Sequence, residues 1–193
     1  MKDTKKLVVT ALFAALTCIA TMIIKIPTPT LGYIHLGDAF VLLSGIILGP
    51  LTGAIAAGTG SMFADIFSGY LSWAPATFII KFLTALLSGF LFRKFQKLSH
   101  RSSSPYAGIV LSGIPSEAVM VLGYFLYEIF LAASASGSFQ ASALTGAIVA
   151  SATGIPFNIL QGVTGIVICV VLLPVLLKID AVKQWTFGDY RLS

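Results

Sequence analysis

Long apolar segments dominate the sequence, separated by short stretches rich in proline, glycine, serine and basic residues. A helix needs roughly 20 apolar residues to cross the hydrocarbon core of a bilayer. The pattern predicts six helices, at about 5–24, 37–49, 51–67, 75–95, 105–133 and 143–179. They leave no room for a soluble domain. We therefore expect residues 1–193 to form a single all-α domain, an integral membrane bundle of six transmembrane helices.

The segment 37–67 is the ambiguous part of this pattern. As one straight helix it would be about 46 Å long, which is short for two full crossings of about 30 Å each. Basic residues resolve the ambiguity, because Lys and Arg concentrate on the cytoplasmic side of a membrane. If the segment turns at Gly49-Pro50 and crosses twice, all but two of the 12 basic residues lie on one side. These are Lys2, Lys5, Lys6, Arg93, Lys94, Lys97, Arg101, Lys178, Lys183 and Arg191. Two short, tilted helices are thus favoured, with both termini in the cytoplasm.

Composition supports a membrane protein and excludes several other classes. Hydrophobic residues make up 57% of the chain and charged residues 10%, against about 25% charged in a soluble domain. Soluble globules, disordered chains, coiled coils and disulfide-stapled modules are therefore excluded. The net charge of +5 is explained by membrane orientation, so we expect no nucleic-acid partner. Cys18 and Cys169 lie in apolar runs and are expected to be core residues, not a disulfide or a metal site.

Polar side chains recur at helical spacing in three of the predicted helices. A charged group at membrane depth costs about 2.5–3.5 kcal/mol and persists mainly where it faces a cavity or a partner. Each of the three sets falls on one helix face. The sets are Thr77, Lys81, Thr84 and Ser88; Glu117, Val121, Tyr124 and Glu128; and Ser151, Gly154, Asn158, Gln161 and Gly165. We expect these stripes to converge on a polar site that opens toward the outside.

Aromatic residues on the outer side add a ligand chemistry to this predicted site. Tyr33, Trp73, Tyr124 and Tyr127 can sandwich a flat heteroaromatic ring, while a carboxylate and an amide pair with its amino and ring-nitrogen edge. The candidate substrate-binding residues are Lys81, Glu117, Tyr124, Glu128, Asn158, Gln161, Trp73 and His35.

Structural roles for the same residues remain open. Lys81 can form an ion pair with Glu117 or Glu128, and Glu128 can be wet at the interface. Asp38 and Asp65 are expected to be helix caps or interfacial groups. Asn158 and Gln161 can make interhelical hydrogen bonds, and the aromatic residues can belong to an interfacial belt.

The first predicted helix carries small residues on its surface. Ala11 and Ala15 are four residues apart, as are Thr10, Ala14 and Cys18. Such spacing lets another helix approach closely, either within the bundle or on a second membrane subunit. The chain has no nucleotide-binding motif and no convincing pair of nucleophile and base. We therefore expect a binding protein, not an enzyme, that relies on a separate motor subunit.

Four motifs carry a resemblance to a known family. They are Thr10-Ala-Leu-Phe-Ala-Ala-Leu16, Tyr33-Ile-His-Leu-Gly-Asp38, Gly49-Pro50-x-x-Gly53 and Gly60-x-x-x-Ala64-Asp65. Over essentially its whole length the chain resembles the substrate-binding (S) components of energy-coupling factor (ECF) transporters. The segment Pro156-Phe-Asn-Ile-Leu-Gln-Gly162 resembles the subgroup assigned to hydroxymethylpyrimidine or pyridoxine, with riboflavin-type members nearby.

The resemblance implies a high-affinity vitamin-binding subunit of an ATP-driven importer in the bacterial plasma membrane. The expected ligand is hydroxymethylpyrimidine, then pyridoxine or riboflavin, captured from outside under closing loops. The expected partners are a transmembrane coupling subunit and two ATPases. Ala11 and Ala15 would contact the coupling subunit. The chain itself would hold no cofactor, since the ATPases use the ATP. The alternative is a stand-alone, ion-coupled secondary carrier with an ion site at Asp65 or Glu117.

Overall fold

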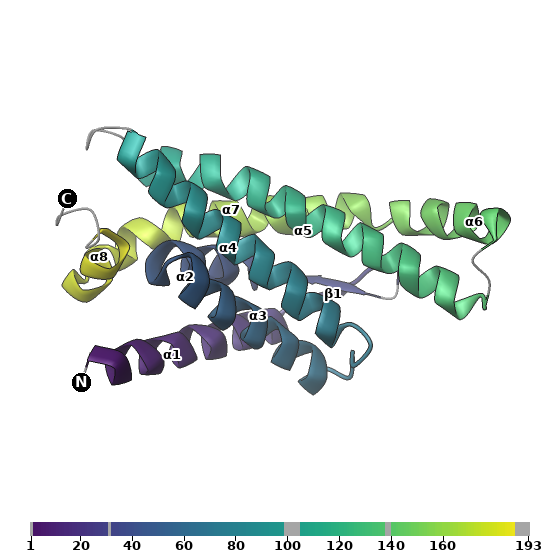
Figure 1. The fold of residues 1–193 in the computed structure, drawn as a ribbon, viewed down its shortest axis with the longest axis horizontal. Helices are drawn as coiled ribbons and strands as arrows, with labels where there is room; N and C mark the ends of the chain where they lie inside the picture. Colours follow the sequence, from purple (N-terminus) through teal and green to yellow (C-terminus); the bar gives the residue numbers. More distant parts are fainter. Residues whose placement is uncertain (1, 31, 99–104, 138–139, 188–193) are drawn as a thin grey trace.

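The computed structural model describes residues 2–30, 32–98, 105–137 and 140–187. Within these ranges the chain is a helical bundle with one small hairpin (Figure 1). The elements are α1 (Lys2–Ile23), β1 (Lys25–Pro27), β2 (Tyr33–His35), α2 (Asp38–Leu48), α3 (Pro50–Phe67), α4 (Ala74–Leu98), α5 (Pro105–Ala135), α6 (Ala141–Ala152), α7 (Ile155–Leu176) and α8 (Asp180–Phe187).

Helix α2 lies at the centre of the bundle, where it contacts α1, α3, α4, α7 and α8. It is apolar on nearly every face, as expected for a helix surrounded by protein. Its leucines and isoleucines join Phe13, Phe92 and Leu173 in the main apolar core. Gly45 lets α4 approach closely, because a Cβ there would lie 2.2 Å from the carbonyl oxygen of Ala85. This close packing brings the first turn of α2 beside polar residues of α4.

The predicted turn at Gly49-Pro50 is confirmed. Gly49 has a φ of 90°, which side chains other than glycine rarely adopt, and Pro50 starts α3. Proline is favoured in the first turn of a helix because its missing N–H would have no intrahelical acceptor there. The segment 37–67 is thus two helices, which pack against each other.

Three features differ from the sequence-based expectation. The segment 143–179 contains a helix break, with α6 ending at Ala152 and α7 starting at Ile155. Pro156 explains it, since proline is placed early in α7, where it lacks the N–H that a continuous helix would need. The stretch between the first two helices, expected to be a loop, holds the β1–β2 hairpin. Helix α8 adds a short, amphipathic C-terminal element.

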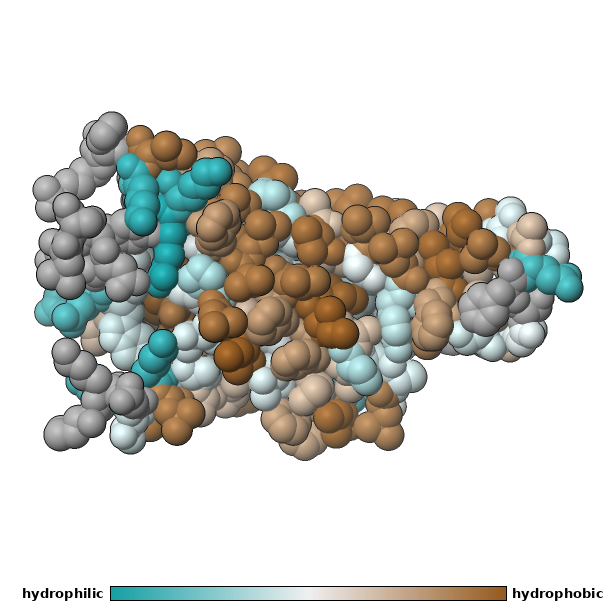
Figure 2. All heavy atoms as spheres, in the orientation of Figure 1, coloured by the Kyte–Doolittle hydropathy of each residue, from teal (hydrophilic) through white to brown (hydrophobic). Residues whose placement is uncertain are grey.

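Four segments of the described residues are long and apolar enough to cross a membrane: Thr4–Ile23, Ala74–Leu98, Pro105–Ala135 and Ala141–Leu176. Helix α2, with 11 residues, is about 16 Å long and too short to cross alone. The count of six crossings therefore stays a prediction. Large apolar side chains cover the middle of the face shown in Figure 2, which suits contact with lipid.

Basic residues gather at one end of the bundle. The start of α1, the end of α4, the start of α5 and α8 lie together at the left of Figure 1, and hydrophilic residues concentrate there in Figure 2. Arg93, Lys94 and Lys97 are carried by the end of α4. Arg101 and Arg191 lie outside the described residues. The shared end agrees with the predicted one-sided charge, and its cytoplasmic location stays a prediction.

Candidate functional site

A small cavity lies beneath the β1–β2 hairpin, at the ends of α3, α4, α5 and α7 that are remote from the basic end. Its lining residues are Thr28, Gly32, Tyr33, Asp65, Trp73, Thr77, Tyr124, Glu128 and Asn158. The cavity volume is about 20 Å³, the space of about one water molecule. A heteroaromatic ring therefore enters only if the hairpin or the lining side chains move.

The hairpin is short and antiparallel. Lys25 pairs with His35, and Pro27 with Tyr33. The turn between the strands is closed by a hydrogen bond from the Thr28 N–H to the Gly32 carbonyl oxygen, at 3.0 Å. Isolated two-stranded hairpins are marginal in water, so this one depends on contacts to the helices around it.

Three hydrogen bonds hold the hairpin region to three different helices. The Tyr33 hydroxyl donates to Oδ1 of Asp65 on α3 at 2.6 Å. The Thr30 hydroxyl donates to Oε1 of Glu128 on α5 at 2.9 Å. The backbone N–H of His35 donates to Oε1 of Gln161 on α7, also at 2.9 Å. The segment therefore bridges the helix ends that surround the cavity.

Aromatic rings form one wall of the cavity. Trp73 lies 6.2 Å from Tyr124 and 5.6 Å from Tyr127 between ring centroids, the latter edge-on. Tyr33, which also lines the cavity, lies 4.7 Å from Tyr70 between ring centroids. The Tyr124 hydroxyl donates to Oγ1 of Thr77 at 3.3 Å, although either hydroxyl has a proton to give. Such a wall offers a flat ligand both stacking and edge contacts.

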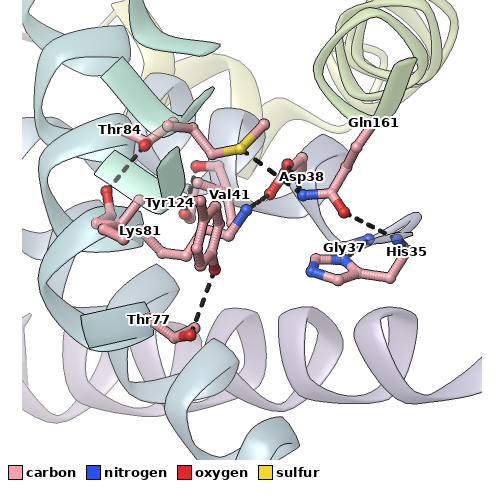
Figure 3. A network of polar contacts seen from close by, with 12 residues as sticks. His35, Gly37, Asp38, Val41, Thr77, Lys81, Thr84, Tyr124 and Gln161 are labelled. Carbon is pink, nitrogen blue, oxygen red and sulfur yellow. Dashed lines mark hydrogen bonds and ion pairs between the residues drawn. The ribbon is translucent and has the colours of Figure 1, made fainter. Parts of the chain in front are cut away.

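A buried polar network lies behind this wall (Figure 3). Lys81 Nζ lies 2.5 Å from Oδ1 of Asp38, and neither side chain is exposed. The Gln161 amide donates to the second oxygen of Asp38 at 2.7 Å. Lys81 also lies 5.0 Å from the centroid of the Tyr124 ring, a cation–π distance. The ion pair is thus satisfied from several sides and supports the back of the aromatic wall.

The pairing of Lys81 corrects the sequence-based alternatives. Glu117 and Glu128 were the alternative partners left open for Lys81, and Asp38 was expected to be a cap or an interfacial group. Asp38 is instead the buried partner of Lys81. The close approach of α7 explains why Asp38 is buried, because a Cβ on Gly165 would lie 2.9 Å from the Asp38 Cβ, which places the first turn of α2 inside the bundle.

Two side chains of the hairpin have shifted pKa values. Burial, and secondly the charge of Lys81, lower the pKa of His35 to about 3. Its Nδ1 accepts a hydrogen bond from the Gly37 N–H at 3.0 Å, which requires that nitrogen to be unprotonated. Burial and the neighbouring Asp65 raise the pKa of the Tyr33 hydroxyl. Tyr33 therefore keeps its proton and remains a donor.

The three predicted stripes do face the interior. All four members on α4 are buried, as are Glu117, Tyr124 and Glu128 on α5 and the five members on α6 and α7. The glycines leave room as expected: a Cβ on Gly154 would lie 2.8 Å from Oε2 of Glu128, and one on Gly165 would lie 2.9 Å from Cβ of Asp38.

The predicted binding residues divide into two layers. Trp73, Tyr124, Glu128 and Asn158 line the cavity. Lys81, Gln161 and His35 lie in the network behind it, and Glu117 packs against Gly162. Both carboxylate oxygens of Glu117 are buried, with no hydrogen-bond partner among the residues that the structure describes. A ligand contact by these last four residues stays a prediction.

Sequence reasoning left Thr28, Gly32, Tyr33, Asp65 and Thr77 out of the candidate set. Thr77 and Tyr33 carried a signal, through the α4 stripe and the outer aromatic group. Asp65 is 4% exposed, and its carboxylate at the end of an apolar helix was interpreted as interfacial. Thr28 and Gly32 had no signal, because their place depends on the fold of the hairpin.

The small residues of α1 face two ways. Ala11 and Ala15 are exposed, whereas Ala14 packs against α3, where a Cβ on Gly60 would lie 2.3 Å from its carbonyl oxygen. One side of α1 thus belongs to the bundle and the other is available to a partner.

In the described ranges, no group of three or more His, Cys, Asp or Glu residues is placed to hold a metal ion.

Comparisons with known proteins agree with this architecture. The family model described as "ECF-type riboflavin transporter, S component" matches residues 1–178. A protein of Pyrococcus woesei, described as "Uncharacterized protein in gap 3'region", is 39% identical over 107 residues; the match spans 55% of this chain and 66% of that one. A solved structure described as "Structure and mechanism of the S component of a bacterial ECF transporter" shares the fold, with a TM-score of 0.63 at 19% identity, covering 91% of this chain and 97% of the other.

Proposed function

Because the chain belongs to the family of ECF-type riboflavin transporter S components, we propose that it is the vitamin-binding subunit of an ATP-driven importer in the plasma membrane. Its partners are a transmembrane coupling subunit, docked at Ala11 and Ala15, and two ATPases that use the ATP. S components bind the substrate of a transporter and are not enzymes.

The observation that carries the proposal is the composition of the cavity wall. Aromatic rings from Tyr33, Trp73 and Tyr124 stand beside two carboxylates and the Asn158 amide. Rings provide stacking surface, and the carboxylate and amide oxygens accept hydrogen bonds from ring substituents. This combination supports a small heteroaromatic vitamin or precursor as the ligand.

Among such ligands we place hydroxymethylpyrimidine first, then pyridoxine and riboflavin. The small cavity volume supports a single-ring compound, because less of the wall must move to admit it. The segment 156–162 lines one side of this region through Asn158 and carries the resemblance to the pyrimidine and pyridoxine subgroup. Riboflavin stays in the comparison because the matching family is described by it.

Capture by the hairpin follows from its three attachments. The bonds to Asp65, Glu128 and Gln161 close the cavity, so a ligand enters when some of them break and is retained when they form again. Transfer to the other side of the membrane would then depend on the partner subunits.

Binding by the purified chain tests the proposal. We expect micromolar or tighter binding of at least one compound in a panel of hydroxymethylpyrimidine, pyridoxine, riboflavin and related vitamins. Asn158→Ala should weaken binding at least about tenfold, the effect of one lost buried hydrogen bond to a ligand. Thr164→Ala is the matched control, because Thr164 is on the same helix and bonds to the Leu160 carbonyl away from the cavity.

Two results would contradict the proposal. One is the absence of binding to every heteroaromatic compound in the panel. The other is uptake into vesicles by this chain alone, driven by an ion gradient without ATPase partners, which would support the secondary carrier instead.

A further inference from the structure

Asp65 and Glu128 share an unusual arrangement in the cavity wall. Each uses one carboxylate oxygen to hold the hairpin segment, Asp65 through Tyr33 and Glu128 through Thr30. In each case the second oxygen is buried and makes no hydrogen bond of ordinary length among the described residues. The nearest side-chain donors are lining residues of the same cavity, the Thr77 hydroxyl for Asp65 and the Asn158 amide for Glu128. The side chains are 4% and 6% exposed.

A buried carboxylate oxygen without a donor is costly, by about 1–3 kcal/mol or more when charged. Proteins seldom carry two such oxygens in one small cavity unless something else supplies the donors. Both residues line the same cavity, so a molecule bound there can reach both oxygens.

The cavity offers no positive charge of its own to these carboxylates. None of its nine described lining residues is Lys, Arg or His. Lys81, behind the wall, is paired with Asp38 at 2.5 Å. Lys25, outside it, donates to Ser68 Oγ at 2.8 Å and lies over the Tyr33 ring. An anion in the cavity would therefore face two carboxylates without a counter-charge.

We propose that the ligand is a heteroaromatic molecule that presents hydrogen-bond donors at two positions, at least one of them an amine or a protonated nitrogen, to Asp65 and Glu128. This inference rests on the proposed function and adds the chemical class of the substrate. Charge-assisted hydrogen bonds are about twice as strong as neutral ones, so a cationic donor is preferred to a hydroxyl. Ligands with a carboxylate or phosphate at the same position are rejected.

The same arrangement links the ligand to the hairpin. The ligand donor binds one oxygen of a carboxylate and the hairpin hydroxyl binds the other oxygen. The hairpin hydroxyl therefore positions the carboxylate for the ligand, and the bound ligand positions it for the hairpin. Removing a hairpin hydroxyl should weaken binding of all ligands alike. Removing the carboxylate charge should instead reduce the preference for an amine over a hydroxyl.

A matched ligand series separates these effects. Pyridoxamine, pyridoxine and 4-pyridoxic acid carry an amine, a hydroxyl and a carboxylate at one ring position. We expect the full chain in detergent to bind pyridoxamine at least about tenfold more tightly than pyridoxine, the range for a hydrogen bond to a charged group, and not to bind 4-pyridoxic acid. Titration calorimetry gives the three dissociation constants.

Variants then assign the preference to residues. Asp65→Asn or Glu128→Gln should reduce the preference for the amine to about threefold or less, because a neutral amide loses the charge assistance. Tyr33→Phe and Thr30→Val should weaken both amine and hydroxyl ligands and keep their ratio. Size-exclusion profiles and thermal unfolding of each variant show that the protein is folded.

The outcomes distinguish this inference from the proposed function. Equal or tighter binding of pyridoxine or 4-pyridoxic acid would overturn the inference and leave a vitamin-binding subunit. If the chain binds none of the three but binds another panel vitamin, the inference is supported only if that vitamin carries an amine or a protonated nitrogen and its affinity falls at least about tenfold in Asp65→Asn or Glu128→Gln. Unchanged affinity in both variants, or a ligand without such a nitrogen, would overturn it. Failure to bind any heteroaromatic compound would overturn both.

Discussion

The buried pair of Lys81 and Asp38 gives the sharpest prediction about stability. Lys81→Met keeps the length of the side chain but removes its charge and its donors. Asp38 would then remain in the bundle with only the Gln161 amide as a partner. The converse variant, Asp38→Leu, would leave the Lys81 ammonium without its carboxylate.

The structure sets the size of the effect. Both side chains are fully buried and their charged atoms are 2.5 Å apart. Breaking a buried ion pair by removing one partner costs about 3–5 kcal/mol, because the remaining charge has no compensation, whereas replacing both partners with apolar residues is often close to neutral. The double variant Lys81→Met/Asp38→Leu should therefore be more stable than either single variant by at least about 2 kcal/mol.

The assay is equilibrium unfolding in mixed detergent micelles, followed by circular dichroism, for the wild type, the two single variants and the double variant. Lys25→Met is the control: Lys25 is exposed and contacts Ser68, so its loss should cost less than about 1 kcal/mol. A double variant as unstable as the sum of the singles would refute the reasoning. So would a loss below about 1 kcal/mol for Lys81→Met.

Three further predictions concern pH, packing and partner docking. The pKa of His35 is about 3 in the folded state and near 6.5 in the unfolded chain. The stability that neutral His35 contributes is therefore present above pH 6.5 and is lost as the pH falls. Between pH 7.5 and 5.5 the free energy of unfolding of the wild type should fall by about 1.4 kcal/mol relative to that of His35→Asn. Gly45→Ala should destabilise the protein by more than about 2 kcal/mol in the same unfolding assay, whereas Gly146→Ala, with open space around the Cβ, should be neutral or stabilising by up to about 1 kcal/mol. Replacing Ala11 and Ala15 with Phe should abolish copurification with the coupling subunit and leave ligand affinity unchanged, and normal copurification would contradict the docking face.

The helical periodicity predicted the interior faces well. Thr77, Lys81, Thr84 and Ser88 are all buried on α4, because a helix in lipid has no alternative place for a row of polar groups. The turn at Gly49-Pro50 was also predictable, since glycine permits a positive φ that ends one helix and proline fixes the φ that begins the next.

The partner of Lys81 and the shape of the site were not predictable in the same way. Two carboxylates, Glu117 and Glu128, were candidate partners of Lys81 in the sequence, whereas the folded bundle pairs it with Asp38. The hairpin strands have three residues each and one contains Pro27, so no alternating pattern reveals them. The part of the cavity lining that lies next to the hairpin, including Asp65, depends on where this hairpin folds.

The most direct test of the central claim is small-molecule mass spectrometry of what copurifies with the chain, combined with binding of the recovered compound to the stripped protein. The account predicts a heteroaromatic vitamin or precursor that rebinds to the stripped protein with a micromolar or lower dissociation constant. The same compound should bind more weakly to Asn158→Ala. Recovery of no such compound, together with no binding across the vitamin panel, would contradict it.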